Sequence, residues 1–288
     1  MILEIQEKTG ASHRKICNTL RIPRSSFYHA AQLSPLDLSE KKAGDQIEII
    51  FKRHRGRYGH RRIRQQMAEE GVICSSQRVR KLMKNRGLRA IAAKNFIPKT
   101  SDGKALKPAP NLLSDRPLPT LPNQVWTADI TYIPSTTGWL YLAVVMDLCT
   151  RKILGWKLAE HMRSELVLQA FDQALHSTTR STQSAIFHSD RGSQYGSKAF
   201  RDALENAGFS QSMSARSNPY DNAWTESFFG TLKREMLQRG SFENFHDAHT
   251  EIFEYIHGYY NTHRKHSSLD YMSPALFEQK SFTLEFAA

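Results

Sequence analysis

The chain has 288 residues, enough for two or three domains, and its composition is that of a globular protein rather than a fibrous or disordered one. It has no apolar run near the roughly 18–20 residues of a transmembrane helix and no signal-peptide pattern, so we expect a cytoplasmic protein without a membrane partner. The net charge is +12, and residues 1–110 carry 24 Lys and Arg against 9 Asp and Glu, which predicts an N-terminal nucleic-acid-binding region.

The first 35 residues predict a small helical unit resembling a helix-turn-helix. Ile16 and Leu20 lie one helical turn apart, and Ser12 is available as an N-terminal cap. A proline then breaks the pattern, and the stretch "RSSFYHA" resumes it. Helix, short turn and helix is the order of a helix-turn-helix, with Arg24 near DNA phosphates.

Residues 31–44 predict a linker, and residues 44–97 predict three more helices that form a basic helix-turn-helix domain. Ser75 or Ser76 would cap the third helix, and Gly87 suits the position after its end. The apolar positions of the three helices are Ile47, Ile50, Phe51, Ile63, Met67, Val79, Leu82 and Met83.

Basic side chains are concentrated within this domain. Eight of the twelve residues in "RHRGRYGHRRIR" are Arg or His, and we favour phosphate contact over a solvated basic loop. The third helix carries basic residues away from its apolar stripe and is the better candidate for a recognition helix. The predicted DNA-binding residues of this domain are Arg57, His60, Arg61, Arg62, Arg78, Lys81 and Lys84.

Residues 98–123 predict an extended, proline-rich linker and hence a domain boundary. Six prolines fall between positions 98 and 124 without any hydrophobic periodicity.

Residues 124–240 predict a mixed-sheet α/β domain. Three sequential strands separated by short turns predict an antiparallel meander. Helix, strand, helix, strand and helix follow, and residues 241–288 predict a last long helix and a tail. The four tryptophans, Trp126, Trp139, Trp156 and Trp224, are interpreted as core residues.

Three acidic residues are candidates for a functional role because of their positions in the predicted elements. Asp129 lies inside the first strand, on the same face as Val125 and Thr127, where an unpaired carboxylate is costly to bury. Asp190 ends a short strand, and the carboxyl ends of strands are where α/β folds place their chemistry. Glu226 lies on a helix.

The helix that carries Glu226 is amphipathic. Its apolar stripe is Trp224, Phe228, Leu232 and Met236, with Phe229 at the edge. Glu226 shares another face with Gly230 and with Lys233, two turns further on. Carboxylates from a strand, a strand end and a helix can together hold two divalent cations that clamp a phosphodiester.

Other polar residues have simpler interpretations. Asp221 or Asn222 is favoured as the N-terminal cap of the helix that carries Glu226, and Asp147 as a structural acid. His188 is interpreted as packed beside its strand. A serine nucleophile near Asp190 lacks an oriented His–Asp partner, and His257, His263 and His266 lack the cysteines of a zinc site. The three separated cysteines are interpreted as buried, reduced thiols.

Thirty-five residues separate Asp190 from Glu226. With this spacing, the stretches "WTADITYI", "HSDRGSQYGS" and "SNPYDNAWTESFFGTLKRE" resemble the DDE core of retroviral integrases and of bacterial insertion-sequence transposases of the orfB type. The resemblance covers about residues 124–278 and implies a ribonuclease-H-like fold. The basic "RYGHRRI" segment resembles that family's helix-turn-helix.

The resemblance implies that Asp129, Asp190 and Glu226 are the metal-binding catalytic triad, holding two Mg²⁺ or Mn²⁺ ions, and that Lys233 contacts transposon-end DNA. It further implies cleavage at the element's terminal inverted repeats, joining of 3′-hydroxyls to target DNA, and a homo-oligomer on paired ends. The rival functions are a ribonuclease-H-like nuclease without strand transfer and a DNA-binding repressor. Related transposases often add an upstream leucine-zipper segment by frameshifting, and this chain has no sustained heptads.

Overall fold

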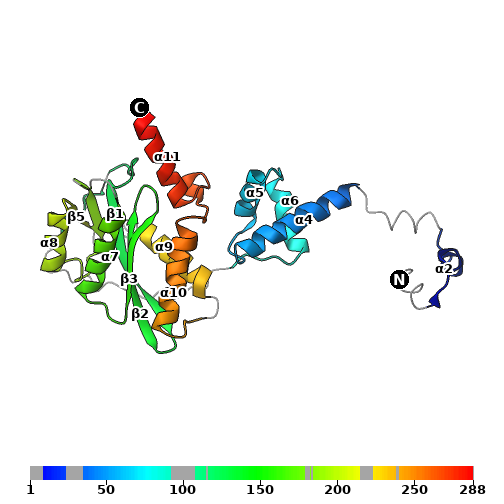
Figure 1. The fold of residues 1–288 in the computed structure, drawn as a ribbon, viewed down its shortest axis with the longest axis horizontal. Coiled ribbons are helices and arrows are strands. Elements are labelled where there is room, and N and C mark those ends of the chain that lie inside the picture. The colour runs from blue at the N-terminus through cyan, green and yellow to red at the C-terminus, as the bar shows by residue number, and fades with distance from the viewer. Residues whose placement is uncertain are drawn as a thin grey trace. The chain divides into compact units, whose positions relative to one another are not determined.

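The computed structural model describes residues 9–23, 35–91, 108–114, 116–178, 182, 184–214, 223–237 and 240–287 (Figure 1). Arg24, the predicted second N-terminal helix and the predicted cap at Asp221 and Asn222 lie outside these residues. The chain forms two compact units, residues 1–90 and 91–288. Within the described ranges, no helix is both long and apolar enough to cross a membrane.

The first unit is helical. Its apolar stripes are buried as predicted, apart from Phe51, which is half-buried, and Leu20, which is exposed. Ser12 and Ser75 cap their helices by accepting hydrogen bonds from backbone N–H groups, and Gly87 takes a left-handed φ of +68° after the last helix. The helices are α2 (His13–Thr19), α4 (Pro35–Arg53), α5 (His60–Glu69) and α6 (Ser76–Asn85).

The predicted linker at residues 31–44 is wrong from Pro35 onward, because α4 begins there. A proline is tolerated in the first turn of a helix. Tertiary contacts stabilise this turn-rich stretch as a helix: the guanidinium of Arg86, at the end of α6, donates to the backbone oxygen of Lys41 at 3.1 Å and to Asp45 at 2.7 Å. A methyl group on Gly44 would lie 2.3 Å from Nε of Arg86, so the guanidinium packs directly against the backbone of α4 at this glycine.

The second unit contains a five-stranded mixed sheet in the order β3-β2-β1-β4-β5. The first three strands form the predicted antiparallel meander, and β4 and β5 run parallel to β1. The strands are β1 (Val125–Ser135), β2 (Gly138–Asp147), β3 (Ile153–Ala159), β4 (Ile186–Ser189) and β5 (Ser210–Met213).

Helices cover both faces of this sheet (Figure 1). Alternation along β1 sends Trp126, Ala128 and Ile130 into the core shared with α7 (Ser164–Ser177) and α8 (Lys198–Asn206). The opposite face packs against α9 (Ala223–Met236) and α10 (Phe245–Phe253). Asp129 therefore lies on the face opposite Trp126 and Ile130, as predicted, and this face is the one that α9 covers.

One glycine lets a helix approach the sheet closely. A methyl group on Gly155 of β3 would lie 2.1 Å from the backbone oxygen of Ala170 in α7. Residue 155 must therefore lack a side chain for α7 to pack on β3.

The predicted last long helix is present, but it starts at Phe245 and α10 continues directly into a π-helix, η2 (Glu254–Tyr260). Helix periodicity in sequence does not distinguish the two, because both have an apolar stripe. A short 3₁₀ helix, η3 (Ser267–Leu269), and α11 (Pro274–Ala287) complete the fold. We did not predict α11 as a separate helix.

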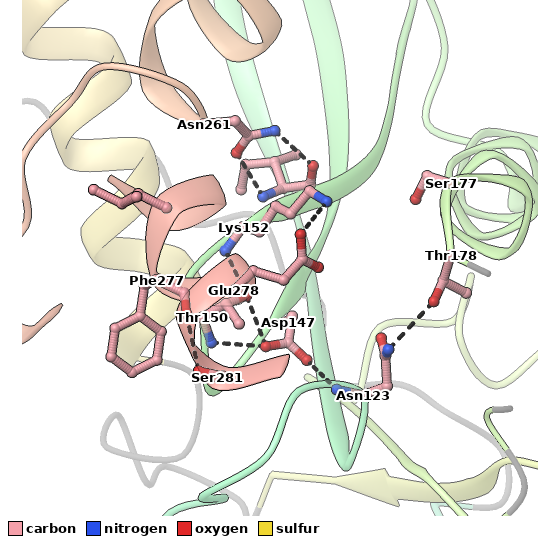
Figure 2. Close-up of polar contacts among 12 residues, drawn as sticks. Asn123, Asp147, Thr150, Lys152, Ser177, Thr178, Asn261, Phe277, Glu278 and Ser281 are labelled. Carbon is pink, nitrogen blue, oxygen red and sulfur yellow. Dashed lines mark hydrogen bonds and ion pairs between the residues drawn. The ribbon is translucent and has the colours of Figure 1, made fainter. Parts of the chain in front are cut away.

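Asn261, which follows η2, lies at the outer edge of β3 (Figure 2). Its amide accepts from the N–H of Ile153 at 3.0 Å and donates to the carbonyl of the same residue at 2.9 Å. Gln173 of α7 accepts the next free N–H on this edge, that of Trp156, at 2.7 Å. Side-chain amides thus satisfy backbone groups that a neighbouring strand would otherwise pair.

The predicted proline-rich linker packs against the core where the structure describes it. The N–H of Leu112 donates to Ser212 of β5 at 2.9 Å, and the carbonyl of Pro110 accepts from Met213. Leu112 and Leu113 also pack against Val125. The extended-linker expectation is therefore wrong for this stretch, since hydrogen bonds to β5 and apolar contacts hold it on the domain.

Candidate active site

Asp129 and Asp190 are brought together by strand register. Ala128 of β1 pairs with Ser189, the last residue of β4, and the two strands are parallel. The residues that follow this pair, Asp129 and Asp190, therefore come next to each other at the carboxyl end of β4, on the same face of the sheet. Asp129 is buried and Asp190 is half-buried.

A buried hydrogen bond fixes α9 to this part of the sheet. Thr225 of α9 donates to the hydroxyl oxygen of Thr127 in β1 at 3.0 Å, and neither side chain is exposed. Glu226 is the next residue on α9 and is exposed. Lys233 lies two turns further along and is half-buried.

The neighbouring charged residues shift the pKa of Asp129. Burial, followed by the negative charge of Asp190, raises the pKa of Asp129 well above its usual value, and Glu226 adds to the rise. A hydrogen bond from the N–H of Ile130 at 2.7 Å and the charge of Lys233 act in the opposite direction. Burial lowers the pKa of Lys233, and Asp129 partly offsets that effect. Asp129 therefore lies within the fields of two other acids and one lysine.

The donor chemistry of this acidic site fits a hard divalent cation. All three candidate ligands are carboxylates, the type that Mg²⁺ and Mn²⁺ prefer, and after burial the charges of Asp190 and Glu226 contribute to the raised pKa of Asp129. The described residues contain no group of three His, Cys, Asp or Glu already close enough to hold a metal ion. The acids therefore share an electrostatic site without forming a closed coordination sphere.

The loop after β4 is held in place by its own contacts. Oδ1 of Asp190 accepts from the N–H of Gly192 at 2.9 Å, and Gln211 of β5 donates to the carbonyl of Tyr195 at 2.8 Å. The ring of Tyr195 is buried against Phe200. The tyrosine hydroxyl has no hydrogen-bond partner among the residues that the structure describes.

The sequence did not reveal a buried ion pair on α9. Glu235 accepts from Arg264 at 3.0 Å and from the hydroxyl of Tyr255 at 2.9 Å, and both charged side chains are almost fully buried. The predicted apolar stripe is shifted accordingly: Trp224 and Met236 are only half-buried, whereas Phe228 and Leu232 are buried. The ion pair ties α9 to the segment after η2.

Asp147 has the structural role that was predicted (Figure 2). Its carboxylate accepts from the N–H of Asn123 and from both the N–H and the hydroxyl of Thr150. Close to it, Lys152 forms an ion pair of 2.6 Å with Glu278 of α11. These contacts close the turn after β2 and attach α11 to the core.

The histidines have ordinary partners. His188 hydrogen bonds with Ser212 and Ser214, as its packed interpretation implied, and Nε2 of His257 accepts from the indole of Trp156 at 3.0 Å. Trp126 and Trp156 are core residues, as predicted. Trp139 is not: it is 49% exposed at the start of β2, where the strand extends beyond the covering helices.

The predicted DNA-binding residues of the first unit differ in their surroundings. Arg61 and Lys84 are exposed. Arg78 donates to Ser39, and Lys81 forms an ion pair with Glu40. The remaining three are half-buried, namely Arg57, His60 and Arg62. Two further arginines of these helices that we did not single out, Arg64 on α5 and Arg80 on α6, are also exposed.

Comparison with protein families assigns residues 119–219 and 207–274 to integrase core domains and residues 38–96 to an HTH-like domain. The chain is 43% identical over 242 residues to the transposase of insertion sequence IS904 from Lactococcus lactis, covering 84% of this chain and 93% of that protein. It is 34% identical to transposase InsF of IS3A from Escherichia coli, covering 94% and 95%. An uncharacterized 31 kDa protein of insertion element IS600 from Shigella sonnei is 40% identical, covering 92% and 98%.

Among solved structures, the HTLV-2 integrase catalytic core in complex with magnesium aligns with a TM-score of 0.42 and 16% identity, covering 55% of this chain and 97% of that one. The integrase-core match confirms the expected ribonuclease-H-like α/β class, with helices ahead of the sheet.

Proposed function

The chain belongs to the family of insertion-sequence transposases with an integrase core, and from this premise we propose that Asp129, Asp190 and Glu226 are its catalytic acids. Membership makes the protein a DNA transposase, an enzyme that cleaves and transfers DNA strands. The rival nuclease and repressor functions are not favoured by these relatives.

The observation that carries the proposal is the register that brings Asp129 next to Asp190. Glu226 raises the pKa of Asp129, and Lys233 lowers it. Both residues lie on α9, which is hydrogen-bonded to β1 through Thr225. Three carboxylates from three separate elements would then serve one site, which is an arrangement suited to metal-assisted phosphoryl transfer between DNA strands.

The three acids would hold two divalent cations, Mg²⁺ or Mn²⁺. When bound, such ions supply positive charge for the phosphodiester transition state and promote attack first by water and then by a DNA 3′-hydroxyl. Asp129, buried on the sheet, and Asp190, in a loop fixed by Gly192, provide the rigid part of the site. Exposed Glu226 contributes the side that faces the DNA.

Lys233 would contact the DNA end that enters this site. It shares the Glu226 face of α9 and keeps part of its side chain exposed. A lysine there balances the acidic site and attracts the phosphate backbone.

The first unit would bind the terminal inverted repeats through Arg57, His60, Arg61, Arg62, Arg78, Lys81 and Lys84, with Arg24 contributing from the segment before α4. Arg61 on α5 and Lys84 on α6 are exposed and therefore the most accessible for phosphate contact. A homo-oligomer would hold the two ends together, since each transposition event joins a pair of ends to target DNA.

A strand-transfer assay tests the proposal. The full chain is incubated with precleaved element-end oligonucleotides, supercoiled target DNA and Mg²⁺. We expect joined products from the wild type and a loss of at least about 100-fold in Glu226→Gln and Asp190→Asn, because each variant removes a charge that would neutralise a cation. Glu251→Gln, which changes an exposed acid on α10, is the matched control and should join strands normally.

Each alternative gives a different result. Cutting without joining would support a nuclease, and end binding without cutting would support a repressor. Joining at the wild-type rate by Glu226→Gln would show that the triad assignment is wrong.

A further inference from the structure

The turn between β2 and β3 places a charged side chain against the first turn of α9. The guanidinium carbon of Arg151 lies 5.4 Å from the centroid of the Trp224 ring, within the range of a cation–π interaction. Trp224 is the second residue of α9, two positions before Glu226. Arg151 therefore contacts the helical turn that carries one of the proposed catalytic acids.

An arginine at position 151 destabilises the fold in two ways. Its backbone has a left-handed φ of +61°, which is unfavourable for a residue with a side chain. Its Nη1 is buried and has no hydrogen-bond partner among the residues that the structure describes. Burial also lowers the pKa of the Arg151 side chain, because the charge has been removed from water. Glycine would relieve the backbone and remove the buried nitrogen.

The turn holds Arg151 in this conformation. The N–H of Arg151 donates to the carbonyl of Asp147 at 2.9 Å, and the N–H of Asp147 donates to the carbonyl of Lys152 at 2.9 Å. The carboxylate of Asp147 also accepts from the N–H and the hydroxyl of Thr150. The backbone is thus fixed on both sides of Arg151, and the turn is a rigid base for its side chain.

The first turn of α9 is held by two successive residues. Trp224 packs against an apolar cluster formed by Val125, Leu148 and Ile186. The next residue, Thr225, is hydrogen-bonded to Thr127 of β1. The guanidinium of Arg151 lies over the ring of Trp224 and adds a third contact to this attachment. Glu226 follows immediately, so its position depends on how firmly this turn is held.

We infer that Arg151 is a positioning residue for Glu226 and that it acts through the ring of Trp224. The inference rests on the proposed function, in which Glu226 is a catalytic acid. Without the cation over the ring, the first turn of α9 can shift relative to the sheet. A displacement of about 1 Å in a reacting group can slow a reaction by about 100-fold. Strain and unpaired polar groups are retained where function requires them, whereas an arginine kept only for the fold would stabilise the protein.

Arg151→Gly tests the inference in the full chain. Three quantities are measured: the strand-transfer rate constant at saturating DNA end, the DNA-end concentration that gives half this rate, and the thermal midpoint in EDTA. We expect the rate constant to fall by about 10–100-fold, because Glu226 is misplaced. The half-saturating concentration should stay within about twofold, because positioning Glu226 leaves DNA binding unchanged. The midpoint should stay the same or rise, because the strained backbone and the buried nitrogen are gone.

Further variants show whether Arg151 acts through Trp224. Arg151→Lys keeps a cation over the ring and should restore most of the rate. Combining Arg151→Gly with Trp224→Leu should give a variant no slower than Trp224→Leu alone, whereas independent effects would multiply. Asp270→Gly is the matched control, because it also replaces an exposed charged residue with a left-handed φ, here +50°, and it should leave the rate constant unchanged.

Several results would overturn the inference. A lower midpoint of Arg151→Gly would mean that the arginine stabilises the fold. A raised half-saturating concentration with an unchanged rate constant would make Arg151 a DNA contact, and losses that multiply in the double variant would exclude action through Trp224.

Glu226→Gln, assayed in parallel, separates the inference from the proposed function. If Glu226→Gln loses strand transfer while Arg151→Gly joins strands like the wild type, only the inference about Arg151 fails. If Glu226→Gln itself joins strands like the wild type, the triad assignment fails, and the inference fails with it.

Discussion

The hydroxyl oxygens of Thr127 and Thr225 lie 3.0 Å apart, and neither side chain reaches solvent. This bond joins β1 to α9 two residues before Asp129 and one residue before Glu226. Both proposed acids therefore depend for their relative placement on a contact between two residues that carry no charge.

Thr225→Val keeps the shape of the side chain but leaves the hydroxyl of Thr127 buried without its donor. We expect the free energy of unfolding to fall by about 1–3 kcal/mol. Replacing both residues by valine should restore most of the loss, since no unpaired hydroxyl remains. Urea denaturation of the two single variants and the double variant measures this coupling. An equal loss in the double variant would mean that packing, and not the hydrogen bond, matters.

Glu235 and Arg264 form an ion pair buried to within a few per cent of full coverage. Burial acts to lower the pKa of Arg264, but Glu235, Tyr255 and Tyr260 together act in the opposite direction, so the net pKa is raised and the arginine stays charged. Glu235→Met would leave the charge of Arg264 buried without a partner and should lower the free energy of unfolding by about 3–5 kcal/mol. Methionine at both positions should leave the free energy of unfolding nearly unchanged. Denaturant titration gives both values.

Asp202→Ala is the control for that pair. It breaks an exposed ion pair with Lys198 one helical turn away, and it should change stability by no more than about 0.5 kcal/mol. A buried-pair variant that behaved like this exposed one would contradict the expected cost.

The raised pKa of Asp129 predicts how the stability of the metal-free protein changes with pH. Because the folded pKa is raised, the folded state keeps a proton that the unfolded state has lost, and stability falls as pH rises from the usual aspartate range through the higher folded value. At pH 7–8 in EDTA, Asp129→Asn should therefore be more stable than the wild type. Each 1 kcal/mol of difference corresponds to about 2–4 °C in the thermal midpoint. A scan from pH 4 to pH 8 should show the two curves separating as pH rises, and parallel curves would contradict the prediction.

Cys149 should react slowly with alkylating agents. Burial, helped by the charge of Asp147, raises the pKa of its thiol from 9.0 to about 11. The reactive thiolate at pH 8 is then about 100-fold scarcer than for a thiol with the ordinary value, and the rate of reaction with iodoacetamide should fall in proportion. Peptide-level mass spectrometry measures the rate, with glutathione as the reference. The rate should still be rising at pH 10.

The spacing of apolar residues predicted most of the fold, because the buried face of a strand or an amphipathic helix is visible in residues that are close together in the sequence. The alternation around Asp129 gave its face of the sheet, and the spacing of Asp190 and Glu226 gave the candidate acids, which remain predictions. The helix ends at Ser12 and Ser75 were predictable because a cap depends on residues three apart.

Long-range partners explain what the sequence did not reveal. Glu235 resembles any polar residue on a helix until Arg264, 29 positions later, folds onto it. Arg86 hydrogen bonds with Lys41 and Asp45 of α4, more than 40 positions before it, and Leu112 hydrogen bonds with Ser212 of β5, 100 positions after it.

The side-chain amides of Asn261 and Gln173 also affect whether another chain can pair with the outer edge of β3. An open strand edge is a template for another chain, and two transposase cores gathered on one DNA molecule would be at high local concentration. With the backbone groups of Ile153 and Trp156 already engaged, an incoming strand would first have to displace both amides. These amides therefore disfavour the pairing of a strand from another copy with this edge of the sheet.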